Sequence, residues 1–209
     1  MYSFLLTIIS GLRWLINGKT KVTGRNNLPK GNYVLIAPHR TFWDPVWHAL
    51  AAKPKKFIFM AKKELNVPIF GWILKKIGAF YVDRENPGPS AIKIPVTELR
   101  DGQRSLVIYP TGSRHSQQLQ SGAITIAKLA KVPMVPVVYQ GPVKFLQLFK
   151  RNNTTVAIGK VIDVPEGKLN EVEQDKLFKQ IQTAFDNLDD SINPDYVYVD
   201  PSPKKINKK

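Results

Sequence analysis

Cysteine is absent from this chain of 209 residues. Its absence excludes disulfide bonds, thiolate metal sites and a covalent thioester intermediate on a cysteine, and it favours a reducing compartment. A G-x-S-x-G serine elbow is also missing, so a serine esterase of that kind is not expected. The three histidines, His39, His48 and His115, show no metal-ligand spacing with carboxylates. We therefore predict neither a metal nor another cofactor.

Negative charge is scarce in this sequence. Lys and Arg total 31 residues against 16 Asp and Glu, which gives a formal net charge of +15. A surface with this charge attracts polyanions, and nucleic acid, anionic lipid and an acidic carrier protein all qualify. No nucleic-acid-binding motif accompanies the charge, so nucleic acid is not expected as a partner.

The apolar stretch at the N-terminus is shorter than the roughly 20 residues that a membrane-spanning helix needs. Its apolar residues recur at helical spacing, with polar residues on the opposite face. The apolar positions are Phe4, Leu5, Ile8, Ile9, Leu12, Leu15 and Ile16, and the polar positions are Ser3, Thr7, Ser10 and Asn17. The pattern predicts an amphipathic helix over residues 1–18 that lies on a membrane surface, an interpretation that Trp14 and the basic charge favour. The alternative is a first helix packed into the core.

The remaining chain alternates short β-rich runs with helical patterns, which is typical of an α/β fold. The predicted strands are 33–37, 57–60, 79–82, 105–109, 135–139 and 155–161. The predicted helices are 45–52, 67–76, 90–100, 118–131 and 171–188, the last with Asn170 and Glu173 as a capping box. We expect a single domain over residues 19–193, with a largely parallel or mixed central sheet covered by helices. Residues 194–209 are predicted to form a basic, mobile tail.

His39 and Asp44 stand at the end of the first of these strands, where the reactive groups of an α/β sheet gather. If Asp44 accepts the Nδ1 proton of His39, the Nε2 atom is left free to take a proton from a hydroxyl. The alternative is that Asp44 only caps the helix before Pro45. For an isolated pair at this spacing the capping interpretation is favoured, so the choice depends on the motifs that follow.

Anion-binding residues follow two other strands. Arg84 lies after the run 79–82, and its guanidinium suits a phosphate or a carboxylate. After the run 105–109, Gly112 permits a close backbone approach beside Arg114. Each signal is weak alone, because a surface arginine or an ordinary turn would look the same.

Taken in order, these stretches resemble the glycerophospholipid acyltransferase family, of the 1-acylglycerol-3-phosphate O-acyltransferase type. The resemblance covers residues 33–140 and implies His39 and Asp44 as catalytic residues. It also implies binding of the substrate phosphate by Arg84, Gly112, Ser113 and Arg114, and a weaker substrate contact by Thr111 and Pro136. The chain departs from the family pattern at Thr111, where the family usually has glutamate, and at Ser113, where it has threonine.

The resemblance implies that His39 deprotonates the free hydroxyl of 1-acylglycerol-3-phosphate, which attacks the thioester of an acyl-CoA or an acylated carrier protein to give phosphatidic acid. The expected location is the cytoplasmic face of a membrane, with the anionic membrane surface as a further partner. A noncatalytic lipid-binding relative is the first alternative, because Thr111 removes a family carboxylate. A basic nucleic-acid-binding domain is the second.

Overall fold

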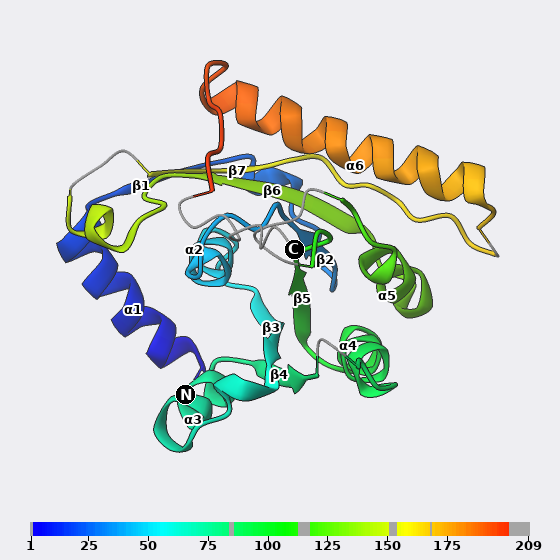
Figure 1. The fold of residues 1–209 in the computed structure, drawn as a ribbon, viewed down its shortest axis with the longest axis horizontal. Coiled ribbons are helices and arrows are strands. Elements are labelled where there is room, and N and C mark those ends of the chain that lie inside the picture. Colours follow the sequence, from blue (N-terminus) through cyan, green and yellow to red (C-terminus); the bar gives the residue numbers. More distant parts are fainter. Residues whose placement is uncertain (1, 84–85, 113–117, 151–153, 168, 201–209) are drawn as a thin grey trace, which may run out of the picture.

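A sheet of seven strands in the order β1-β7-β6-β2-β5-β3-β4 forms the centre of the described part of the chain (Figure 1). The computed structural model describes residues 2–83, 86–112, 118–150, 154–167 and 169–200. The strands are β1 (Thr20–Thr23), β2 (Val34–Ile36), β3 (Lys56–Lys62), β4 (Ala79–Val82), β5 (Arg104–Ile108), β6 (Met134–Gln140) and β7 (Thr154–Ile158). Neighbouring strands are parallel except β6 and β7, which are antiparallel. The sheet is therefore mixed, as predicted.

Helices cover both faces of the sheet. They are α1 (Tyr2–Asn17), α2 (Asp44–Ala51), α3 (Pro68–Lys76), α4 (Ser90–Asp101), α5 (Gly122–Ala130) and α6 (Glu171–Ile192), with short 3-10 turns η1 (Arg25–Asn27), η2 (Lys63–Leu65) and η3 (Phe145–Phe149). Helices α4, α5 and α6 pack on one face and α2 on the other, and α6 and α2 lie on opposite sides of β6 in Figure 1. The domain is thus a three-layered α/β structure.

Burial explains the strand patterns. Every residue of β2 and of β6 is buried. Strands that are covered on both faces have nearly continuous apolar sequences, as these two do. Helix α6 has the predicted capping box, in which the Asn170 Oδ1 accepts from the Glu173 amide at 2.9 Å and the Glu173 Oε2 accepts from the Asn170 amide at 2.9 Å. Its stripe of Leu177, Ile181 and Phe185 is buried against the sheet. The single α/β domain predicted from the sequence is confirmed.

Helices α5 and α6 differ from the predicted ranges by four residues at one end and the other predicted elements by fewer, whereas strand β1 and the three 3-10 turns were not predicted. Helix α5 begins at Gly122 rather than at 118, because the Gln120 amide donates to the Pro110 carbonyl at 2.8 Å and holds the preceding residues against the end of β5. Helix α6 runs on to Ile192. Strand β1 and turn η3 carry no clear apolar period, since β1 is an edge strand with an alternating half-buried pattern. Edge strands of this kind give a weak sequence signal.

Four predicted positions or segments fall on residues that the structure does not describe. Arg84, Ser113, Arg114 and the end of the tail (201–209) lie outside the described residues. Residues 194–200, which the sequence assigns to the tail, are described, and Tyr196 and Tyr198 lie over the guanidinium of Arg40.

Candidate active site

The carboxyl ends of β2 and β5 bring two loops together. Both strands are parallel and directly paired, so the loop that follows Ile36 and the loop that follows Ile108 leave the same edge of the sheet. The first loop carries His39 and leads into α2, and the second carries Tyr109 to Gly112. These two loops build the candidate site.

Asp44 orients the ring of His39. The Nδ1 atom of His39 lies 3.1 Å from the Asp44 Oδ2 atom, and Asp44 is fully buried. Because an ionised carboxylate can only accept hydrogen bonds, the proton sits on Nδ1 and Nε2 is left as the acceptor. The hydrogen bond predicted from the sequence is therefore present.

Asp44 is not the N-cap of α2. The N-cap position is Trp43, and Asp44 is the first helical residue. The carboxylate instead accepts at Oδ2 from the amides of Arg40 (2.6 Å) and Thr41 (2.8 Å), and at Oδ1 from the Thr41 hydroxyl. All of these donors precede the helix, so the capping interpretation of Asp44 is wrong.

The hydrogen bonds keep Asp44 ionised despite its burial. Burial alone would raise the pKa of the carboxyl, but the hydrogen bonds from His39 and Thr41 and the field of His48 outweigh it, and the pKa of Asp44 is lowered overall. A charged carboxylate next to Nδ1 stabilises the imidazolium that forms when Nε2 takes a proton.

Tyr109 supports His39 from the side, which the sequence interpretation missed. The two rings are stacked with centroids 4.2 Å apart and planes at 19°. The Tyr109 hydroxyl lies 3.3 Å from Nδ1 of His48, a buried residue one turn after Asp44 on α2. An aromatic residue directly before Pro110 at a strand end was the only sequence signal. Asp44 thus holds the edge of the His39 ring, and Tyr109 holds its face.

His48 makes the stability of the protein sensitive to acid. Burial lowers the pKa of His48 from 6.5 to about 4, with the nearby Asp44 charge opposing the shift only in part. Between these two values the unfolded chain binds a proton at His48 that the folded chain does not, so stability rises with pH across this window and is lost as pH falls. We expect the shifted pKa of His48 to account for a loss on the order of 3 kcal/mol in the free energy of unfolding as the pH falls through this window.

The His48→Gln variant tests this dependence. Urea unfolding from pH 7.5 to pH 4 is expected to give a shallower loss of stability for the variant than for the wild type. Parallel curves for the two proteins would contradict the assignment to His48.

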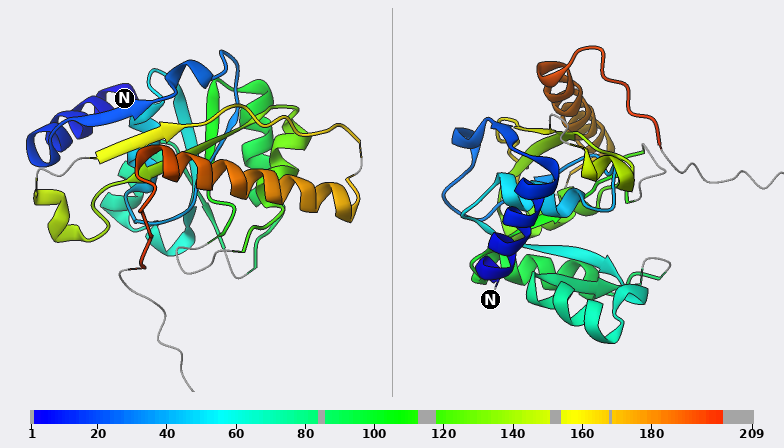
Figure 2. Two further views of the ribbon diagram at one scale, coloured as in Figure 1. Left: turned by 90° about the horizontal axis from the view of Figure 1, so that it is seen from above. Right: turned by 90° about the vertical axis from the view of Figure 1, so that its left-hand side faces the viewer.

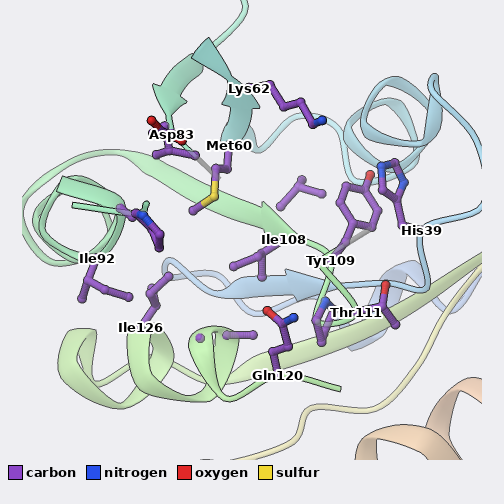
Figure 3. Close-up of a pocket in the computed structure, with 18 of the residues that line it drawn as sticks. His39, Met60, Lys62, Asp83, Ile92, Ile108, Tyr109, Thr111, Gln120 and Ile126 are labelled. Atoms are coloured by element: carbon purple, nitrogen blue, oxygen red, sulfur yellow. The ribbon is translucent and has the colours of Figure 1, made fainter. Parts of the chain in front are cut away.

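A cavity of about 540 Å³ opens beside His39. Its walls are largely apolar, and Figure 3 shows His39 and Tyr109 at one end and Ile92 and Ile126 toward the other. Further lining residues are Met60, Lys62, Val82, Asp83, Pro87, Gly88, Ala91, Val107, Ile108, Pro110, Thr111, Gly112, Gln120, Gly122 and Ala123. Its size and character suit an aliphatic ligand.

The remaining predicted site residues form three groups: those that line the cavity, one that is described but does not line it, and those that the structure does not describe. Thr111 and Gly112 line the cavity, and Gly112 has a φ of 67°, a left-handed conformation that glycine adopts freely. Pro136 lies within β6 beside Gly159 and is not among the described residues that line the cavity. Arg84 and Arg114 are undescribed, but Asp83 and Gly112 both line the cavity.

Comparison with known proteins gives a consistent result. The model of the protein family described as Acyltransferase matches residues 19–140. A Streptococcus pneumoniae 1-acyl-sn-glycerol-3-phosphate acyltransferase is 45% identical over 193 residues, which cover 90% of this chain and 73% of the relative. The Bacillus subtilis protein of the same name is 41% identical over 76% of this chain and 81% of its own length.

A crystal structure shares the fold. The 1-acyl-sn-glycerophosphate (LPA) acyltransferase PlsC from Thermotoga maritima superposes with a TM-score of 0.68 at 19% identity, over 92% of this chain and 81% of that chain. At this identity the likeness establishes the architecture alone.

Proposed function

The chain belongs to the acyltransferase family and is an O-acyltransferase, and from this premise we propose that it transfers a fatty acyl group from a thioester donor to the free hydroxyl of 1-acylglycerol-3-phosphate, giving phosphatidic acid. The names of its relatives support this acceptor. The observation that carries the proposal is the His39 ring, oriented by Asp44 at 3.1 Å and placed at the end of an apolar cavity.

The proposed reaction is a direct transfer. The Nε2 atom of His39 takes the proton of the acceptor hydroxyl, and the hydroxyl oxygen attacks the carbonyl carbon of the thioester. The tetrahedral intermediate collapses, the carbon–sulfur bond breaks, and the departing thiolate takes the proton from His39. Asp44 stabilises the imidazolium between these two steps.

In this proposal Arg84 and Arg114, with Gly112 and Ser113, hold the acceptor phosphate. Guanidinium groups bind phosphate oxygens through paired, charge-assisted hydrogen bonds. The position of Asp83 and Gly112 on the cavity wall supports this role, because each is the sequence neighbour of a proposed ligand or is one itself. Fixing the phosphate would place the acceptor hydroxyl against His39.

The direct test is acyl transfer to lysophosphatidic acid, with acyl-CoA and acylated carrier protein offered separately. We expect phosphatidic acid with at least one donor, which also identifies the donor. If the folded wild-type protein formed no phosphatidic acid with either donor, the proposal would be overturned.

The apolar cavity is proposed to hold the acyl chain, and Ile92 tests this. Ile92 lines the end away from His39, so Ile92→Trp should lower kcat/KM for long chains by about 10-fold or more and spare short ones. The measurement is a chain-length series. Ile94→Trp is the matched control, because Ile94 lies on the same helix α4 at 41% exposure and should leave the series unchanged.

We propose that the protein works at the cytoplasmic face of a membrane as a peripheral protein. None of the described helices is long and apolar enough to cross a bilayer. In α1 the described residues that are buried are Leu6 and Asn17, whereas Phe4, Leu12 and Leu15 are exposed. Most of its apolar stripe is therefore exposed, and the helix lies along one side of the domain (Figure 2). Such a stripe on a basic protein suits anionic lipid.

Helix α3 and turn η3 present further apolar side chains that support this surface. Ile69 and Trp72 on α3 and Leu146 on η3 are exposed, and η3 packs against α1. Lys144 and Lys150 flank η3. Aromatic and basic residues around an apolar face are typical of membrane-surface segments.

Replacing the outward stripe should weaken membrane binding without unfolding the domain. Leu12→Gln with Leu15→Gln is expected to reduce co-sedimentation with vesicles that contain phosphatidylglycerol by about 10-fold. Val172→Gln, at an exposed site on α6, is the matched control. The surface assignment would be contradicted if both variants bound equally well. It would also be contradicted if the wild-type protein did not bind these vesicles.

A further inference from the structure

Arg40, the residue after His39, is buried and fully engaged. Its guanidinium donates through Nη1 to the Tyr139 carbonyl and to the Asp189 Oδ1, each at 2.9 Å, and through Nη2 to the Asp189 Oδ2. Burial alone would lower the pKa of Arg40, but the Asp189 pairing raises it overall. The positive charge of Arg40 is therefore paired with the carboxylate of Asp189 inside the protein.

The segment that follows α6 covers Arg40. The rings of Tyr196 and Tyr198 lie 5.1 Å and 5.7 Å from the Arg40 guanidinium carbon. The Tyr198 hydroxyl donates to the Arg40 carbonyl at 2.8 Å. Figure 1 shows this segment turning back from the end of α6, and the Tyr198 hydrogen bond places it at the loop before α2.

The main-chain amide of Arg40 connects this cluster to the site. It donates to the Asp44 Oδ2 at 2.6 Å, and the same oxygen lies 3.1 Å from Nδ1 of His39. A displacement of Arg40 therefore moves the oxygen that orients His39. Through its amide, carbonyl and side chain, this residue is tied to Asp44, Tyr198 and Asp189.

Asp189 is also held by strand β6. The Gln140 Nε2 at the end of β6 donates to the Asp189 carbonyl at 3.0 Å and to its Oδ1 at 2.9 Å. A largely buried charged pair that is held from two sides keeps one geometry. The end of α6 is thus fixed relative to the loop that carries His39.

We propose that Arg40, Asp189 and Tyr198 are positioning residues, through which the end of α6 and the segment after it hold the His39–Asp44 pair in its reactive geometry. The inference rests on the proposed acyl transfer for its kinetic test. It assigns a catalytic consequence to a part of the chain about 150 positions from His39. A role in stability alone is the competing outcome.

Two conservative variants and two matched controls separate these outcomes. Tyr198→Phe keeps the ring and removes the hydroxyl that donates to Arg40, and Asp189→Asn removes the charge that pairs with it. Tyr196→Phe is the first control, since the Tyr196 hydroxyl has no hydrogen-bond partner among residues 2–200 that the structure describes. Asp190→Asn is the second, because Asp190 is the exposed neighbour of Asp189 on α6.

We expect kcat to fall about 3- to 10-fold in Tyr198→Phe and at least about 10-fold in Asp189→Asn, with KM for lysophosphatidic acid within about twofold. The rate of each variant is measured well below its own melting temperature, so that all of the protein is folded. The controls should match the wild type. Rates in Asp189→Asn and Tyr198→Phe equal to those of the controls would overturn the inference in favour of stability alone.

A readout that needs no turnover is the proton resonance of His39 Nδ1. We expect it far downfield in the wild type and both controls, and shifted upfield or broadened in Asp189→Asn at a temperature where the fold is intact. An unchanged resonance in this variant would overturn the positioning role. If the wild type makes no phosphatidic acid, the proposed function fails, and this resonance still decides whether the cluster positions His39.

Discussion

His39→Ala is expected to lower kcat by about 10³-fold and to leave KM for lysophosphatidic acid nearly unchanged. Without the imidazole, the acceptor hydroxyl has no base that could take its proton during attack on the thioester. Bound substrate would still be positioned, so a residual rate above the uncatalysed reaction should remain.

The His39→Ala measurement needs a control for folding, because His39 stacks on Tyr109. Melting temperature and far-UV circular dichroism of the variant should stay close to those of the wild type, since His39 is partly exposed. A folded His39→Ala protein with the full wild-type rate would refute the general-base role. His39→Gln, which restores the volume but not the basicity, should be as slow as His39→Ala.

Asp44→Asn is expected to lower kcat by about 10² to 10⁴-fold while the chain still folds. The asparagine Oδ1 can replace the oxygen that accepts from the Arg40 and Thr41 amides. The same neutral oxygen then faces Nδ1 of His39, so the negative charge that stabilises a protonated His39 is lost.

Stability separates this effect from simple damage. Asparagine keeps an acceptor for the Arg40 and Thr41 amides, so the chain should remain folded at 25 °C, and urea unfolding measures the loss of stability. Asp190→Asn makes the same chemical change at an exposed site on α6 and should change neither rate nor stability. An Asp44→Asn enzyme with wild-type kcat would remove Asp44 from the mechanism.

Local patterns in the sequence were enough for much of the fold. The run Ala79–Val82 matches β4 exactly, and the capping box of α6 follows from Asn170 and Glu173 three positions apart. The His39–Asp44 hydrogen bond was also predictable, because a turn of four intervening residues brings the two side chains within reach. Such features depend on residues that are close together in the sequence, and local sequence patterns predict them well.

Contacts between distant segments could not be predicted in this way. Arg40 meets Asp189 across 149 positions, and that meeting depends on the rotation of α6 about its axis and on the length of the chain between them. Tyr109 was visible only as the last residue of a strand, because its stacking on His39 depends on the pairing of β2 with β5. Register and helix packing decide such contacts, and one sequence contains no direct signal for either.

Asn17 joins the last turn of α1 to the body of the protein. Its Nδ2 donates to the carbonyls of Leu148 (3.3 Å) and Lys150 (3.2 Å), and its Oδ1 accepts from the Thr154 hydroxyl at 2.7 Å. These hydrogen bonds join the end of the first helix to residues in and after η3 and to the start of β7. If the outer side of α1 enters a lipid leaflet as proposed, the leaflet would orient the domain through this helix, and the buried amide of Asn17 is one of the contacts that would transmit that orientation.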